Sequence, residues 1–198
     1  MKRLSILFTA IFAFTALFFS INENVKAEIS IGGTVGNFSL PDTNGKNQTL
    51  NDLKGEKGTV IVFVSAQCPV VKAYNERINQ IAADYKAKGI NFVGINSNST
   101  ETEAQIKSHT EETYKFSVLI DKGNVIADQF GANVTPEMFY FNEKNVLVYH
   151  GAIDDDKSGK NIQINYLRDA FDLTLAGKAV TKTTANAFGC GIKRVSKN

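Results

Sequence analysis

Residue types that build metal and cofactor sites are scarce in this chain. Its 198 residues include two histidines, two cysteines and no tryptophan. The histidines, His109 and His150, stand 41 residues apart, and no cysteine or carboxylate cluster accompanies them at ligand spacing. The segment Asp154 to Gly159 begins like a calcium loop, but Asn165 stands where that loop needs a bidentate glutamate. We therefore predict no metal site and no cofactor.

The net charge is also small, and the excess of basic over acidic side chains lies within residues 1–27. The formal net charge is +2, and residues 1–27 carry three basic side chains against one acidic side chain. A basic start, an apolar stretch from Leu4 to Ile21, and small residues at Val25 and Ala27 are typical of a cleaved signal peptide. An uncleaved membrane anchor is the alternative.

Cleavage after Ala27 would leave residues 28–198, a length that suits one domain. That mature chain carries 19 basic and 19 acidic side chains. A balanced charge gives no reason to expect nucleic acid or an anionic membrane surface as a partner. We expect an exported protein, periplasmic or otherwise extracytoplasmic, that is free of the membrane once its signal peptide is removed.

Strands alternate with helices along the mature chain. A continuous β-branched run from Thr59 to Ser65 is typical of a strand covered on both faces. Small hairpins are expected between Glu28 and Leu53, where turn residues are frequent. Further elements are a helix from Val70 to Tyr85, strands at Ile90–Ile95 and Phe116–Ile120, helices at Glu101–Glu112, Asn124–Phe130 and Asn161–Ala176, and a hairpin of Met138–Phe141 with Val146–Tyr149. This order predicts an α/β fold, a central mixed sheet with helices on both faces.

Cys68 lies where the first buried strand gives way to a helix, directly before Pro69. Unpaired N–H groups at a helix start favour the reactive thiolate form. The alternative is a small buried hydrophobe. Ser65, three residues earlier, has a hydroxyl that could donate to the thiolate or to a peroxide oxygen. Val71 occupies the position that would complete a Cys-x-x-Cys pair, which excludes a local disulfide.

The second cysteine, Cys190, lies 122 residues after the first, within a polar C-terminal tail from Lys178 to Asn198. Glycines flank it on both sides. Two interpretations remain open. A mobile tail could carry Cys190 to Cys68 and close a disulfide during turnover, or a permanent disulfide could tether the tail to the body.

Five blocks, in order, resemble the peroxiredoxin-like branch of the thioredoxin superfamily, the redoxins or alkyl hydroperoxide reductase and thiol-specific antioxidant relatives. They are Ser65–Tyr74, Gly89–Asn98, Thr135–Pro136, Gly151–Asp155 and Gly189–Lys193. The resemblance implies a thioredoxin-like fold, a redox role for Cys68, and a cis-proline at Pro136 facing it. The chain departs from the peroxiredoxin pattern at Ile61, where that pattern has proline, and from the thioredoxin pattern at Val71.

The residues and the resemblance together predict an exported thiol-dependent oxidoreductase. Cys68 would attack a peroxide or a protein disulfide at a mouth lined by Thr135 and Pro136, and Cys190 or an external thiol would resolve the product. An external thiol reductant is therefore an expected partner. The alternative is a redox-inactive binding or scaffold module that has kept the fold, with a structural disulfide or none.

Overall fold

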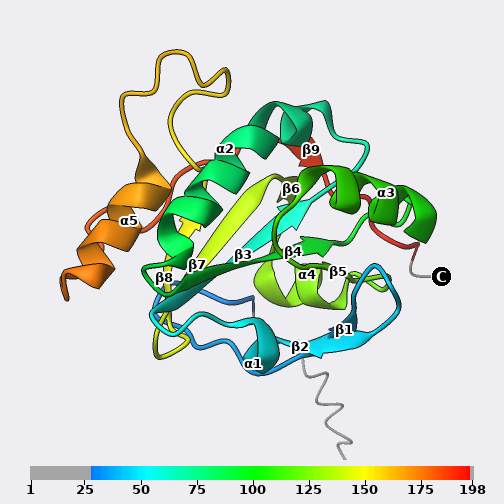
Figure 1. The fold of residues 1–198 in the computed structure, drawn as a ribbon, viewed down its shortest axis with the longest axis horizontal. Coiled ribbons are helices and arrows are strands. Elements are labelled where there is room, and N and C mark those ends of the chain that lie inside the picture. The colour runs from blue at the N-terminus through cyan, green and yellow to red at the C-terminus, as the bar shows by residue number, and fades with distance from the viewer. Residues whose placement is uncertain (1–27, 197–198) are drawn as a thin grey trace, which may run out of the picture.

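A five-stranded mixed sheet forms the centre of the protein, whose residues 28–196 are described by a computed structural model (Figure 1). The strand order is β5-β4-β3-β7-β8. β4 runs parallel to β3 and β5, whereas β7 is antiparallel to β3 and β8. The strands are β3 (Gly58–Val64), β4 (Ile90–Asn96), β5 (Val118–Ile120), β7 (Glu137–Asn142) and β8 (Leu147–Gly151). The predicted α/β fold is confirmed.

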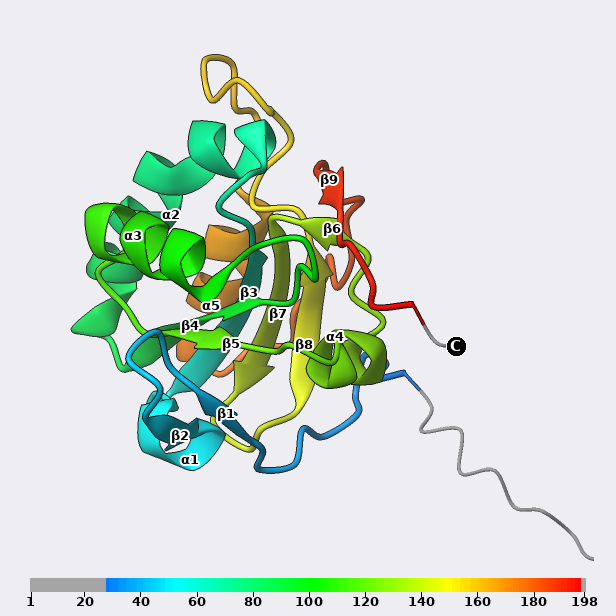
Figure 2. The same ribbon diagram turned by 90° about the vertical axis from the view of Figure 1, so that its right-hand side faces the viewer.

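Helices cover both faces of this sheet (Figure 2). α2 (Pro69–Lys86) and α5 (Tyr166–Leu175) pack on the face that carries Val60 and Val62 of β3. α4 (Val125–Phe130) packs on the opposite face, against Ile61 and Phe63. Every residue of β3 is buried, because successive side chains of a central strand enter opposite layers of the core.

The parallel pairing of β3 with β4 decides which loops meet. Val64 at the end of β3 lies beside Asn96 at the end of β4. The chain leaves β3 through the loop that ends at Cys68, and it leaves β4 through Asn98 and Glu101 toward α3 (Glu103–Thr113). The loops after both strands therefore lie at the same end of the sheet, beyond the carboxyl ends of β3 and β4.

The N-terminal part of the described chain is a small addition to this core. β1 (Ser39–Pro41) and β2 (Asn47–Thr49) form an antiparallel hairpin, as the turn-rich sequence predicts, and α1 (Leu50–Leu53) follows it. The predicted signal peptide, residues 1–27, lies outside the described residues. Within residues 28–196, none of the helices has the length and apolar character needed to cross a membrane.

The last helix is shorter than its sequence suggests, and the prediction that it starts at Asn161 is wrong. α5 begins at Tyr166. Carboxylates of the preceding loop accept hydrogen bonds from the N–H groups of this segment: Asp156 Oδ2 accepts from Asn161 N at 2.6 Å, and Asp155 Oδ1 accepts from Ile164 N at 3.0 Å. These side-chain bonds stabilise a loop in place of the first helical turn.

Candidate active site

Cys68 is the N-cap residue of α2, with extended backbone angles, and Pro69 occupies the first turn. Proline is suited to that position because its missing N–H would have no helical partner there. The side chain of Cys68 belongs to the core cluster between the sheet and α2, and the residue is only 2% exposed. The predicted strand-to-helix corner is confirmed, and it places the sulfur at the positive end of an 18-residue helix.

The structure joins Cys68 to Cys190 by a disulfide, with 5.9 Å between the Cα atoms. Cys190 lies in β9 (Cys190–Gly191), which pairs antiparallel with β6 (Val134–Thr135), so that Cys190 lies opposite Thr135. Sγ of Cys68 is 3.3 Å from the carbonyl oxygen of Thr135, and the Thr135–Pro136 peptide bond is cis. Of the predicted site residues, the structure thus brings Cys68, Cys190, Thr135 and Pro136 together.

The segment that carries Cys190 is bonded to the body on its upstream side. We call residues 183–195 the strap. His150 N at the end of β8 donates to Thr183 O at 2.9 Å, and Ala185 N donates back to His150 O at 3.1 Å. A Cβ on Gly151 would approach Ala185 O to 1.8 Å, so the strap lies directly on the β8 backbone at that point.

The strap is bonded equally on its downstream side. Ile192 N donates to Asn133 O at 2.9 Å, and Val195 N donates to Asn124 Oδ1 at 2.8 Å. The loop after β4 adds Ser99 N, which donates to Lys193 O at 2.9 Å. Cys190 therefore lies between two sets of hydrogen bonds, neither of which involves a sulfur atom.

A residue that the sequence reasoning missed, Glu101, organises the loop before Cys68. Its carboxylate accepts a hydrogen bond from the Ser65 hydroxyl, from Ala66 N at 2.9 Å and from Gln67 N at 3.2 Å. Asn96 Nδ2 donates to the same carboxylate at 2.7 Å. The predicted order of the strands could have indicated this contact, because residues that follow two adjacent parallel strands meet at the same end of the sheet.

The side chains of Ser65, before Cys68, and of Arg77, on the helix after it, are bonded to groups other than sulfur. The Ser65 hydroxyl donates to Glu101 in this disulfide form. The guanidinium of Arg77 pairs with Asp154 Oδ2 at 2.6 Å and donates to the carbonyl of Asp156 at 2.9 Å. Burial raises the pKa of Asp154 even though Arg77 acts in the opposite direction. Arg77 is thus held in an ion pair on α2.

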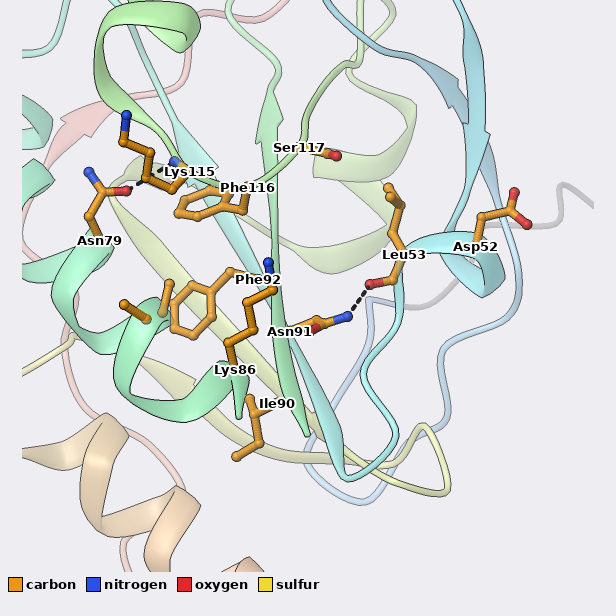
Figure 3. Close-up of a pocket in the computed structure, with 12 residues that line it drawn as sticks. Asp52, Leu53, Asn79, Lys86, Ile90, Asn91, Phe92, Lys115, Phe116 and Ser117 are labelled. Carbon is orange, nitrogen blue, oxygen red and sulfur yellow. Dashed lines mark hydrogen bonds between the residues drawn. The ribbon is translucent and has the colours of Figure 1, made fainter. Parts of the chain in front are cut away.

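A cavity of about 330 Å³ has neither cysteine in its lining, which Figure 3 shows in close-up. Ile90, Asn91 and Phe92 line it from the start of β4, and Leu53 and Asn79 line it from neighbouring segments. Because Cys68 follows the end of β3 and β4 is parallel to that strand, this cavity is at the other end of the sheet. It contains none of the predicted site residues.

Solved structures share this architecture. A hypothetical protein from Sinorhizobium meliloti 1021 has a TM-score of 0.77 and 32% identity, covering 86% of this chain and 97% of that one. Peroxidoxin BcpB from Mycobacterium tuberculosis has a TM-score of 0.58 and 20% identity, covering 75% of this chain and 96% of that one. The thioredoxin-like fold is confirmed.

The chain belongs to the AhpC/TSA family, which it matches over residues 31–150. It is 32% identical to the thiol-disulfide oxidoreductase ResA of Bacillus subtilis (strain 168) over 127 residues, 62% of this chain and 68% of that protein. It is 28% identical to the peroxiredoxin Bcp of Escherichia coli (strain K12) over 105 residues, 52% of this chain and 65% of that protein. The family match includes Cys68 and Pro136 but ends before Cys190. These similarities place the chain among the thiol-dependent oxidoreductases of thioredoxin-like fold.

Proposed function

We propose that Cys68 and Cys190 form a redox-active pair that transfers two electrons from an external thiol to an oxidised substrate. The observation that carries this proposal is the disulfide itself, which joins a cysteine at a helix N-terminus to one on the strap. The helix end stabilises Cys68 as thiolate, the form that acts as nucleophile and as leaving group.

With a disulfide substrate, the proposed cycle consists of two successive exchange steps. In the reduced protein, the Cys68 thiolate attacks one sulfur of a substrate disulfide, and the other sulfur leaves and takes up a proton. The Cys190 thiolate then attacks Cys68 Sγ, forms the disulfide seen here, and releases the second substrate thiol. Attack on a hydroperoxide would instead break its O–O bond, release the alcohol or water after protonation, and leave a sulfenic acid on Cys68. Cys190 would condense this sulfenic acid to the same disulfide with loss of water.

The two sulfurs differ in access, which assigns the step that restores the dithiol. Cys68 is almost fully buried, whereas Cys190 is partly exposed between two exposed glycines, and Phe188 beside it is 48% exposed. An external thiolate would therefore attack Cys190 and form a mixed disulfide on the strap. Cys68 would leave as the thiolate that the helix favours.

An extracytoplasmic location fits this pair, because oxidising compartments allow disulfides to form and persist. The basic and apolar start of residues 1–27 supports export with cleavage after Ala27. The substrate would then be a disulfide or hydroperoxide outside the cytoplasm, and the reductant a thiol there. N-terminal sequencing of protein secreted from a bacterial host would test this, since a start other than Glu28 contradicts the cleavage site.

The redox role is tested in a single turnover. Reduced protein is mixed with 2-hydroxyethyl disulfide, and released mercaptoethanol is followed with time. We expect Cys68→Ser to lose at least about 100-fold in rate, because the nucleophile is gone. Cys190→Ser should stop after one step, with a mercaptoethanol adduct on Cys68 detectable by mass. If Cys68→Ser reacts as fast as the unsubstituted protein, the assignment of Cys68 is wrong.

A permanent structural disulfide in a redox-inactive module is the second candidate. The hydrogen bonds on both sides of Cys190 favour it, because they would hold the two sulfurs together in any redox state. The two functions differ in their response to glutathione. A catalytic pair is reduced at millimolar glutathione within minutes, whereas a structural disulfide resists, as free-thiol counts before and after treatment would show.

A further inference from the structure

Glu101 uses one carboxylate to occupy the hydrogen-bond donors of the loop that ends at Cys68. The Ser65 hydroxyl and the N–H groups of Ala66 and Gln67 all point to it, and these are the residues immediately before Cys68. Asn96, at the end of the neighbouring strand, fixes the carboxylate from its other side. The Glu101 carboxylate therefore occupies the place on this loop where another anion could have bound.

The donors matter because the two candidate substrates develop charge on different atoms. When a thiolate attacks a hydroperoxide, the S–O bond forms, the O–O bond breaks, and charge develops on a compact alkoxide or hydroxide oxygen. Hydrogen-bond donors aimed at that oxygen lower the barrier. In thiol–disulfide exchange the charge is spread over three sulfur atoms and ends on a thiolate, which depends much less on such donors.

The cation on the same helix is also engaged elsewhere. Arg77 pairs with Asp154 at 2.6 Å and donates to the carbonyl groups of Asp156 and Lys157, each at 2.9 Å. Its guanidinium further lies 4.0 Å from the ring centroid of Tyr74. Moving it toward Cys68 would leave the buried Asp154 carboxylate without its cation, a costly change.

We propose that Glu101 closes this site to hydroperoxides and leaves it selective for disulfides, a specificity that rests on the redox role of Cys68 proposed above. Glu101 is a positioning residue. It acts by holding the Ser65–Gln67 donors away from the reacting oxygen and by placing negative charge near the loop, where that charge opposes a developing alkoxide. Removing the carboxylate frees three donors on the three residues that precede Cys68.

The test compares two rate constants measured on the reduced full chain, one with hydrogen peroxide and one with 2-hydroxyethyl disulfide. We expect Glu101→Ala to raise the ratio of the peroxide rate to the disulfide rate at least about tenfold, in line with restoring donors to an oxyanion. Glu101→Gln, which removes only the charge, should raise it less. The matched control is Glu103→Gln, an exposed carboxylate that pairs with Lys122 and does not contact the loop; its ratio should stay unchanged.

Each possible result of this test either supports or overturns the role proposed for Glu101. A damaged loop would slow both reactions and leave the ratio constant, so an unchanged ratio in both Glu101 variants overturns the proposal. A reduced unsubstituted protein that reacts faster with peroxide than with the disulfide overturns it as well. If Glu101→Ala does not fold, the ratio in Glu101→Gln decides. If the unsubstituted protein reacts with neither substrate, the redox function itself fails and this specificity fails with it.

Discussion

The two sulfurs of the disulfide are held in place by different kinds of interaction. On the Cys68 side, carboxylates hold the backbone: Glu101 fixes the preceding loop, and Asp154 pairs with Arg77 on the helix that Cys68 begins. On the Cys190 side, main-chain groups bond to main-chain groups at His150 and Asn133, and one ion pair, Arg194 with Asp128 at 2.9 Å, joins them near the end of the strap.

This difference predicts two different sensitivities. Hydrogen bonds between main-chain groups are independent of pH, but they need close approach of two backbones and so tolerate no added Cβ where the chains touch. Bonds to carboxylates tolerate more variation in shape but depend on ionisation. The Cys68 side should therefore respond more strongly to pH, and the main-chain contacts of the strap should respond more strongly to side-chain size.

The largest expected effect comes from removing the covalent bond between the two sides. Cys190→Ala opens a loop of 122 residues and should lower the free energy of unfolding by roughly 4 kcal/mol, measured by urea denaturation. The unsubstituted protein after reduction with dithiothreitol is the control, and it should lose a similar amount because both changes release the same loop.

Hydrogen exchange in that reduced protein tests the strap directly. The amides of Ile192 and Val195 donate to Asn133 and Asn124, so we expect them to stay protected without the disulfide. Exchange at the rate of an unfolded chain would show that the disulfide alone holds the strap, and the two sides would then not be independent.

A smaller effect is expected from glycine substitutions in the strap. A Cβ on Gly189 would lie 2.2 Å from Thr135 O, a backbone atom that cannot move without disturbing β6. Gly189→Ala should therefore cost about 1–3 kcal/mol and slow disulfide closure. Gly191→Ala is the matched control, since a Cβ there meets nothing within 4 Å. Equal stability of the two variants would contradict close packing of the strap against β6.

The sequence predicts one side of this comparison far better than the other. The β-branched run and the helical spacing place Cys68 at a strand-to-helix corner because both patterns are local: the first is one continuous apolar run, and the second repeats every 3.6 residues. Cys190 and Glu101 reach that corner from 122 and 33 residues away along the chain. No local period encodes such contacts. The adjacency of the parallel strands β3 and β4 could have suggested the contact of Glu101 with the loop before Cys68. The position of the strap, in contrast, depends on the folded backbone of β8.

The smallest expected effect is a change in the shape of the pH–stability curve. Burial raises the pKa of Asp154 above 3.8, so the folded state binds this proton more tightly than the unfolded chain. Its contribution to stability is therefore lost as pH rises from about 4 through the folded pKa. Asp156 is opposite: N–H bonds from Asn161 and Ser158 lower its pKa to about 2, so its contribution is lost as pH falls from about 4 to about 2.

Urea midpoints measured from pH 2 to pH 7 separate these terms. Asp154→Asn should lower stability at neutral pH, because Arg77 loses its partner, and should also remove the decline that begins above pH 4. Asp156→Asn should flatten the loss below pH 4. Gly189→Ala should lower the whole curve without altering its shape, because the added Cβ meets the Thr135 backbone and no ionisable group. A change of shape in Gly189→Ala would mean that the substitution also disturbs the ion pair of Arg194 in the strap with Asp128.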